Sequence, residues 1–173
     1  MSKKLVLVAG NIGAGKTSLA AKLGERLNWH VAYESVDDNP YLADFYNDMR
    51  SWSFHLQIFF LGHRAKQHEA LAAMTRSTII DRSIYEDAHI FARALNVSGD
   101  MSNRDYRAYL ALYRLVVSKL PRPDLLIYIQ ASVPTLRARI EKRGRAIESG
   151  ISDEYLARLN GFYEDWISAF DLC

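Results

Sequence analysis

The sequence is short of several features that would point to particular classes of protein, beginning with cysteine. Its only cysteine is Cys173, the last residue, which excludes an internal disulfide framework and favours a reducing cytoplasm. No apolar run approaches the roughly 20 residues that a membrane-spanning helix needs, so no membrane role is expected. The excess of positive charge is small, because 22 Lys and Arg residues stand against 20 Asp and Glu residues for a net charge of +2. Nothing therefore indicates a nucleic-acid partner.

Internal repeats, low-complexity tracts and linkers are missing as well. The hydrophobic fraction of 49% and the charged fraction of 24% are ordinary for a globular protein. A chain of 173 residues is long enough to bury a core without disulfides. We therefore expect one domain over residues 1–173.

What the chain does contain is a regular alternation of strand and helix patterns. Apolar runs predict strands over residues 5–9, 31–34, 77–81 and 125–129. Apolar residues at helical spacing predict helices over residues 16–27, 41–48, 52–74, 84–95, 106–120, 133–142 and 152–170. The first and last strand runs are apolar throughout, which is typical of strands buried on both faces. Because strands that alternate with helices form parallel sheets, we expect an α/β fold with helices on both faces of the sheet.

A phosphate-binding pattern lies between the first predicted strand and the first predicted helix. The pattern G-x-x-x-x-G-K-[ST] is matched by Gly10, Asn11, Ile12, Gly13, Ala14, Gly15, Lys16 and Thr17. The glycines let backbone N–H groups turn around a phosphate, and the following helix adds positive potential. Lys16 is expected to bridge the outer phosphates, and Thr17 to bind Mg²⁺. ATPases, GTPases and small-molecule kinases share this loop, so other residues must decide what happens to the phosphate.

Two acids follow predicted strands at the edge where open α/β sheets bind ligands. Glu34 ends the second predicted strand and Asp81 the third. A hydroxyl that attacks a phosphate must lose its proton to a base, and a second carboxylate can serve Mg²⁺. We assign Glu34 as the base and Asp81 to the metal, although the two roles can be exchanged and an acid at a strand end can also be a solvated cap. Arg82 is expected to stabilise the transferred phosphoryl group.

An arginine-rich segment follows the fourth predicted strand. Its arginines are Arg137, Arg139, Arg143 and Arg145. Guanidinium groups bind phosphates in a bidentate manner, which favours a lid that closes over a nucleotide. The alternative is a solvated charged surface, since Glu141 and Glu148 lie in the same segment. The phosphate-binding loop favours the lid.

Together these motifs resemble the deoxynucleoside kinase family, especially its bacterial deoxyadenosine and deoxyguanosine kinases. The resemblance is carried by residues 10–17, 33–36, 39–48, 52–64, 81–92 and 137–151. It implies a P-loop NTPase-like sheet of four to five parallel strands in the order 2-3-1-4-5, with a lid at about residues 139–151. It also implies phosphorylation of a nucleoside 5′-hydroxyl by ATP and Mg²⁺ in nucleotide salvage, and a homodimer.

The resemblance also implies roles around the reacting hydroxyl. Glu34 matches the family's general base, which contacts the 5′-hydroxyl. Asp81 and Arg82 match an acid-Arg-Ser motif that serves Mg²⁺, the proton and the 5′-oxygen. Tyr46 and Glu148 match the tyrosine and the lid glutamate that hold the sugar 3′-hydroxyl.

A second set of matching residues concerns the base of the substrate. Gln57 matches the glutamine that reads the base edge, and an amide offers a donor and an acceptor side by side for that purpose. Arg64 and Asp87 match a pair that purine-using members place near the base, and Phe91 matches a ring that stacks on it. A purine deoxynucleoside is therefore the expected substrate.

The sequence departs from the family in two places. Asp37, Asp38 and Asn39 stand where many animal relatives carry a tryptophan near the substrate. The chain also stops where the family continues into a fifth strand and an adenine-binding loop. We therefore expect either a truncated C-terminus or a four-stranded sheet, with no fifth strand in this chain, and weak or absent activity if the chain is a fragment. Two other functions stay open from the sequence: a nucleoside monophosphate kinase, and a nucleotide-binding subunit without catalysis.

Overall fold

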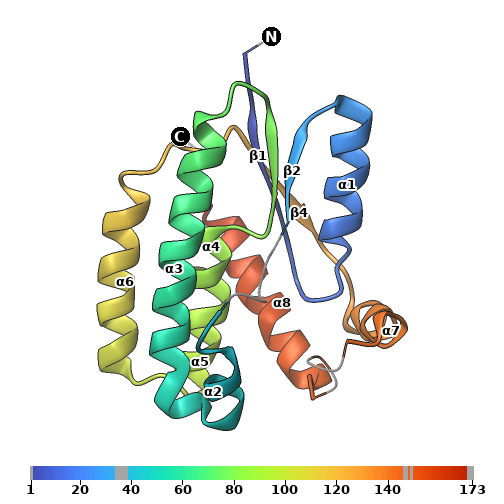
Figure 1. Ribbon diagram of the computed structural model, residues 1–173. Helices are drawn as coiled ribbons and strands as arrows, with labels where there is room; N and C mark the ends of the chain where they lie inside the picture. Colours follow the sequence, from blue (N-terminus) through green and yellow to red (C-terminus); the bar gives the residue numbers. More distant parts are fainter. Residues whose placement is uncertain (1, 34–38, 146–147, 149, 171–173) are drawn as a thin grey trace. The chain divides into compact units, whose positions relative to one another are not determined.

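The computed structural model describes residues 2–33, 39–145, 148 and 150–170 (Figure 1). Its contacts divide the chain into two compact units. The first unit comprises Met1–Tyr33, Arg76–Arg82 and Pro123–Cys173, and the second comprises Glu34–Thr75 and Ser83–Arg122. The two units are described in turn.

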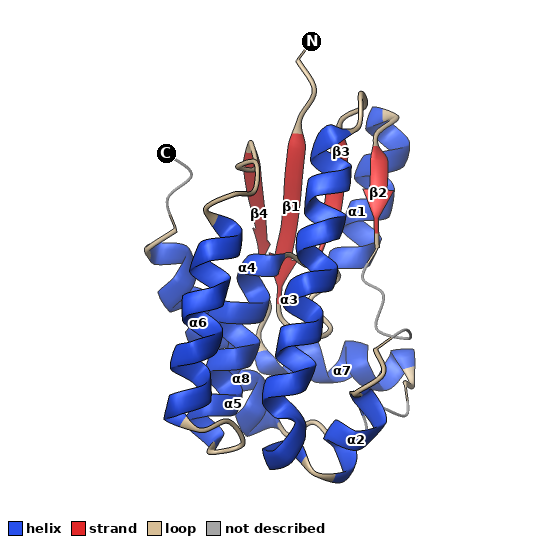
Figure 2. Cartoon of the chain, turned by 60° about the vertical axis from the view of Figure 1, so that its left-hand side comes forward, coloured by secondary structure: helices blue, strands red, loops and turns tan. Residues whose placement is uncertain are grey.

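The first unit is built on a parallel sheet of four strands in the order β2-β3-β1-β4 (Figure 2). The strands are β1 (Leu5–Gly10), β2 (His30–Ala32), β3 (Thr78–Asp81) and β4 (Leu125–Ile129). The register pairs Val8 with Asp81 and Gly10 with Ile129, so the ends of β3 and β4 lie beside the end of β1. The predicted α/β class and the order of these strands are confirmed. Within the described residues the sheet has no fifth strand.

Burial differs between the central strand and the edge strand. All six residues of β1 are buried, as predicted, because β1 lies between β3 and β4. The prediction that β4 is buried on both faces was wrong: Leu125 is 49% exposed and the rest of the strand is only half-buried. The physical reason is that β4 has one neighbouring strand in the described sheet, so one side of it is unpaired.

The short strand β2 also differs from the prediction of residues 31–34. It begins at His30 and ends at Ala32. Tyr33 lies outside the strand, and Glu34 lies outside the described residues. The predicted end of this strand is therefore corrected to Ala32, and the predicted place of Glu34 is not described by the structure.

The described residues of the first unit form the helices α1 (Lys16–Leu27), α7 (Val133–Arg143) and α8 (Asp153–Ser168). Helix α1 packs on the sheet through Ala20, which lies in one cluster with Val6, Val8 and Ile79. Helices α7 and α8 are preceded by the N-cap residues Ser132 and Ser152, whose hydroxyls accept hydrogen bonds from backbone N–H groups of the first turn. These caps fix where each helix starts.

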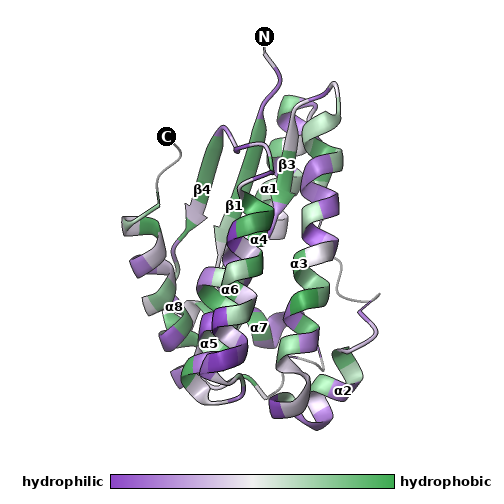
Figure 3. Ribbon diagram, turned by 90° about the vertical axis from the view of Figure 1, so that its left-hand side faces the viewer, coloured by the Kyte–Doolittle hydropathy of each residue, from purple (hydrophilic) through white to green (hydrophobic). Residues whose placement is uncertain are grey.

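The second unit is helical. It contains α2 (Leu42–Asn47), α3 (Met49–Ala73), α4 (Ile84–Glu86), the π-helix η1 (Asp87–Ala92), α5 (Arg93–Ser98) and α6 (Asn103–Val117). Its core includes Phe45, Leu56, Leu95 and Met101. Figure 3 shows hydrophilic residues interspersed among hydrophobic ones along α3. No described helix is both long and apolar enough to span a bilayer.

The segment predicted as one helix over residues 84–95 has an irregular centre. It begins with a capping box, in which Ser83 N–H donates to Glu86 Oε2 over 2.7 Å. It then passes through π-helical turns at Asp87–Ala92 and continues to Ser98. A π-helical turn shifts the helical register and often occurs at functional sites. Apolar spacing alone does not reveal it.

Candidate active-site residues

The phosphate-binding loop is held in a tight turn after β1. Gly13 and Gly15 have φ angles of 80° and 101°, in the left-handed region that favours glycine. A Cβ atom on Gly13 would lie 2.9 Å from the Leu136 carbonyl oxygen, so no larger residue fits there. Ala14 N–H donates to the Asn11 carbonyl over 3.1 Å and closes the turn. The loop therefore has the shape of a phosphate cradle in the structure itself.

Lys16 is buried and folds back over this loop. Its Nζ donates to the Asn11 carbonyl over 3.0 Å, and its side chain is 7% exposed. A buried ammonium group is costly unless it is hydrogen-bonded. Its position in the first turn of α1 provides a positive charge beside the loop.

Thr17 and Asp81 come from different elements and meet directly. The Thr17 hydroxyl donates to Asp81 Oδ2 over 2.6 Å, joining the first turn of α1 to the end of β3. Asp81 is 3% exposed. Because Val8 and Asp81 are register partners, the strand pairing itself brings the carboxylate level with the strand that leads into the loop.

Arg82 follows Asp81 and has an unusual backbone. Its φ angle is 69°, which is uncommon for a residue with a side chain, and it is 6% exposed. Its N–H donates to the Val8 carbonyl over 3.3 Å. A buried arginine in a left-handed conformation is a feature that folding alone does not favour, and such strain tends to gather at functional sites.

The predicted lid arginines have different partners. Arg139 Nη1 donates to the Ala14 carbonyl over 2.7 Å, so this arginine lies against the phosphate-binding loop. Arg143 forms an ion pair with Glu148, and Arg145 Nη1 lies 3.9 Å from Glu148 Oε1. Arg137 instead binds Asp153 and the Ile151 carbonyl at the start of α8.

The lid residues therefore divide by position. Arg139 contacts the loop, Arg143 and Arg145 surround Glu148, and Arg137 connects α7 to α8. Glu148 itself is 8% exposed.

The second unit carries a buried polar group on α3 and η1. Gln57 and Arg64 lie on α3 and are each 4% exposed, and Asp87 lies on η1 and is 3% exposed. Arg64 and Asp87 form an ion pair, and the Arg64 guanidinium lies 5.4 Å from the centre of the Phe60 ring. Both α3 residues are therefore buried, although polar residues of a long helix usually face solvent. The π-helical turn carries both Asp87 and Phe91.

Unlike Arg64 and Asp87, which pair with each other, Gln57 has a side-chain oxygen without a partner among the described residues. This oxygen, Oε1, is buried. A buried amide oxygen without a partner costs about 1–3 kcal/mol, so folding alone would favour an apolar residue there. The atom is available to a ligand.

Tyr46 and Phe91, two further predicted substrate residues, are less enclosed. Tyr46 is 48% exposed on α2, where its ring contacts Phe45 edge to face. Phe91 is half-buried on η1. Glu34, the predicted base, lies outside the described residues.

Reasoning from the sequence missed two residues that hold the phosphate-binding loop in place. Asn160 and Tyr163 of α8 hydrogen-bond to Asn11 and Gly10 of the loop. No sequence pattern marks these two residues. The Ser83–Glu86 capping box was readable as the pattern S-x-x-E before an apolar run.

A phosphate-binding loop after the central strand of a parallel sheet defines the P-loop class of nucleotide-binding proteins. The deoxynucleoside kinase family model matches residues 6–173. A deoxyadenosine/deoxycytidine kinase of Bacillus subtilis is 42% identical over 171 residues, covering 98% of this chain and 79% of the relative. A deoxyguanosine kinase of the same organism is 40% identical over 161 residues, covering 92% and 76%.

A solved structure gives the same result. Deoxyadenosine kinase from M. mycoides with bound dATP superposes with a TM-score of 0.84 and 31% identity, covering 96% of this chain and 84% of that one. The chain belongs to the deoxynucleoside kinase family. It is therefore a phosphotransferase, and the predicted family, fold class and kinase activity are confirmed.

Proposed function

We propose that this kinase transfers the γ-phosphate of ATP to the 5′-hydroxyl of a purine deoxynucleoside. The observation that carries the choice of substrate is the buried Gln57 amide, whose oxygen has no partner in the described part of the chain, because the phosphate-binding loop alone is shared with ATPases and GTPases. An amide matches the donor and acceptor edge of a nucleobase. Relatives named deoxyadenosine and deoxyguanosine kinases support a purine.

On the donor side, the backbone N–H groups of residues 10–15 hold the phosphates of ATP, and Lys16 adds a positive charge next to them. Arg139, Arg143 and Arg145 neutralise charge on the transferred group. Arg139 supports this role because it already lies against the loop. Arg143 exchanges part of its contact with Glu148 for a phosphate.

Thr17 and Asp81 form the magnesium side of the site. Mg²⁺ prefers oxygen ligands and is usually held by one or two carboxylates together with substrate phosphates. A hydroxyl and a buried carboxylate in direct contact fit that donor set. When bound, the ion neutralises negative charge on the phosphates during transfer.

The chemical step forms one bond and breaks another. The 5′-oxygen attacks the γ-phosphorus, the bond from that phosphorus to the bridging oxygen breaks, and ADP leaves. Glu34 accepts the proton of the 5′-hydroxyl, and Asp81 is the alternative acceptor. Arg82 stabilises the charge that develops on the oxygens of the transferred group.

On the acceptor side, Gln57 binds the base edge and Phe91 stacks on the ring. The buried Arg64–Asp87 ion pair borders the base, as the resemblance to purine-using members of the family implies. Tyr46 and Glu148 hold the 3′-hydroxyl. We also propose that the protein is a homodimer and that it is located in the cytoplasm. Size-exclusion chromatography with light scattering tests the dimer.

A substrate panel tests the proposed function. ATP consumption is measured with deoxyadenosine, deoxyguanosine, deoxycytidine, thymidine and the corresponding monophosphates. We expect turnover with a purine deoxynucleoside and none with the monophosphates. Turnover with monophosphates alone would overturn the proposed acceptor, and turnover with no acceptor added would indicate an ATPase.

A further inference from the structure

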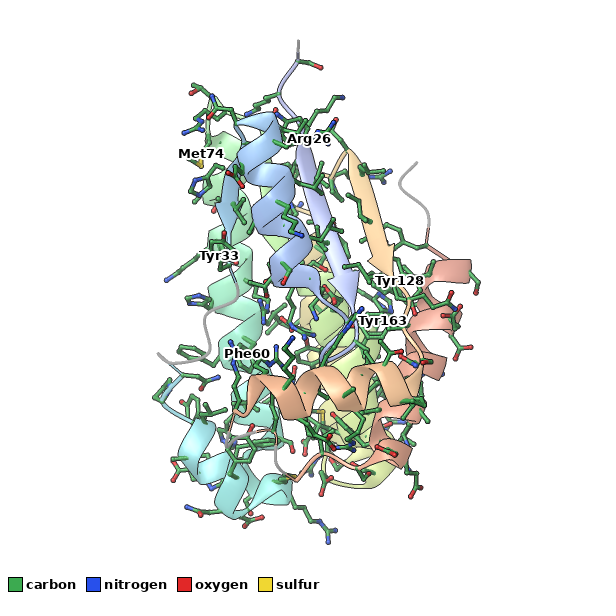
Figure 4. The ribbon with its side chains drawn as sticks, turned by 90° about the vertical axis from the view of Figure 1, so that its right-hand side faces the viewer. Arg26, Tyr33, Phe60, Met74, Tyr128 and Tyr163 are labelled. Carbon is green, nitrogen blue, oxygen red and sulfur yellow. The ribbon has the colours of Figure 1, made fainter. Side chains whose placement is uncertain are left out.

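Helix α8 holds the phosphate-binding loop from one side through a tyrosine. The Tyr163 hydroxyl donates to the Gly10 carbonyl over 2.8 Å, and the side chain is fully buried. Its ring stacks on Tyr128 of β4 with the ring centres 5.6 Å apart and the planes at 16° (Figure 4). Gly10 is the residue at which β1 ends and the loop begins. The hydrogen bond therefore fixes the entrance of the loop.

A second contact holds the next residue of the loop. Asn11 Nδ2 donates to Asn160 Oδ1 over 2.7 Å and to the Leu156 carbonyl over 2.9 Å. Asn160 Nδ2 in turn donates to the Ala131 carbonyl over 3.0 Å. Asn11 Oδ1 accepts from Ile12 N–H over 2.7 Å, so every polar atom of the Asn11 side chain is engaged.

The orientation of Asn11 matters because of its backbone carbonyl. That oxygen accepts from Lys16 Nζ over 3.0 Å and from Ala14 N–H over 3.1 Å. Rotation of Asn11 would therefore displace both the lysine and the turn. The side-chain contacts to α8 prevent this rotation.

We propose that Asn160 and Tyr163 are positioning residues for the phosphate donor: they fix Gly10 and Asn11, and thereby keep the loop and Lys16 in the shape that binds a nucleoside triphosphate. This inference rests on the proposed use of the loop for ATP. When the shape of a site is fixed before binding, the ligand does not have to order it, and the entropic cost of binding is smaller. Loss of the contacts therefore weakens ATP binding while leaving the deoxynucleoside affinity unchanged.

The main test is Tyr163→Phe, which removes the hydroxyl and keeps the ring. Tyr128→Phe is the matched control, because Tyr128 stacks on the same ring but its hydroxyl donates to Glu164 instead of the loop. Dissociation constants of ATP and of deoxyadenosine are measured separately by calorimetry on the full chain. Loss of one neutral hydrogen bond should weaken ATP binding by about fivefold in Tyr163→Phe, and Tyr128→Phe should match the wild type.

Asn160 provides an independent pair of variants. Asn160→Leu removes the contacts to both Asn11 and Ala131, whereas Asn160→Asp keeps an acceptor for Asn11 but places a charged carboxylate oxygen, instead of the donor, next to the Ala131 carbonyl. We expect Asn160→Leu to weaken ATP binding more, and Asn160→Asp to restore part of the loss. Thermal unfolding of each variant is recorded as well.

The outcomes separate the two proposals. If the wild type binds no ATP, both the proposed function and this inference fall. If the wild type binds ATP but Tyr163→Phe and Asn160→Leu change the ATP and deoxyadenosine constants equally, or not at all, the inference alone is wrong. A lower melting temperature with an unchanged ratio of the two constants would likewise show that α8 only stabilises the fold.

Discussion

The Thr17 hydroxyl donates a 2.6 Å hydrogen bond to Asp81 Oδ2, which joins two residues 64 positions apart in the chain. Strand pairing produces this contact, because β3 lies next to β1 and Asp81 is the register partner of Val8. The pairing leaves a buried carboxylate in contact with the first turn of α1. Asp81 is therefore not a solvated strand cap, and its proposed function is to serve Mg²⁺ or to accept the proton.

Asp81→Asn tests that function. The amide oxygen can still accept from Thr17, but the negative charge for Mg²⁺ and for the proton is lost. We expect kcat to fall by about 100-fold or more, and half-maximal activity to need more Mg²⁺. Steady-state kinetics at several Mg²⁺ concentrations measure both quantities.

The control for this change is Thr17→Ser, which keeps the hydroxyl and should retain most of the activity. A variant Asp81→Asn with normal kcat and normal Mg²⁺ dependence would exclude Asp81 from both the metal and the proton transfer.

Gln57→Leu separates binding from stability at the buried amide. Leucine removes an oxygen that has no partner among the described residues, so we expect the melting temperature to stay level or to rise. Without the amide, the KM for the deoxynucleoside should rise by about tenfold or more, since a polar base edge is left unpaired. Kinetics and thermal unfolding of the same preparation provide both values.

Gln67→Leu, on the same helix, is the control for Gln57→Leu. Gln67 is half-buried and has no proposed substrate role, so its substitution should leave the KM unchanged. A clear loss of stability in Gln57→Leu with an unchanged KM would mean that the amide serves the fold and not the base.

Much of the first unit could be predicted because its signals are local. The loop at residues 10–17 has a fixed pattern, β1 is a continuous apolar run, and Asp81 ends the short β-branched strand pattern of residues 77–81. Parallel pairing then brings the carboxyl ends of strands together without further information. The contact between Thr17 and Asp81 is a consequence of these three signals.

The features that were missed depend on tertiary structure. The half-exposed β4 follows from its position at the edge of the sheet, and the π-helical turn at Asp87–Ala92 follows from packing within the second unit. Asn160 and Tyr163 reach the loop across about 150 residues of chain, as the hydrogen bonds from Asn11 to Asn160 and from Tyr163 to Gly10 span 149 and 153 positions. Helical spacing could identify which residues of α8 are buried, but it could not identify their partners.

His68 makes the stability of the second unit depend on pH. Its Nε2 donates to the Pro121 carbonyl over 2.6 Å, and burial lowers its pKa below the ordinary value for histidine. The unfolded chain then binds a proton more readily, so stability is complete above about pH 6.5 and falls as the pH drops towards the lowered pKa. Thermal unfolding measured from about pH 7.5 down to about pH 5, on both sides of the ordinary histidine pKa, should show this loss of stability. The loss should be smaller in His68→Gln.

The exposed His55 lies on the same helix, and His55→Gln is the matched control. Glutamine at position 68 can still donate to the Pro121 carbonyl, so a general loss of packing is avoided. Equal effects of the two substitutions on the pH dependence would show that buried His68 is not its source.

Gly24 and Gly161 should respond in opposite directions to replacement by alanine, although both lie inside helices of the first unit. Alanine normally stabilises a helix interior by about 0.5–1 kcal/mol relative to glycine, and Gly161 has nothing within 4 Å of the space that a Cβ would fill. At Gly24 a Cβ would lie 2.2 Å from Val31 Cγ2, because α1 packs there directly on β2. The clash should outweigh the gain in helix propensity, so we expect Gly24→Ala to lower the free energy of unfolding by about 1–3 kcal/mol and Gly161→Ala to raise it. Urea unfolding of both variants measures the difference, and a stabilised Gly24→Ala would show that α1 and β2 can move apart without cost.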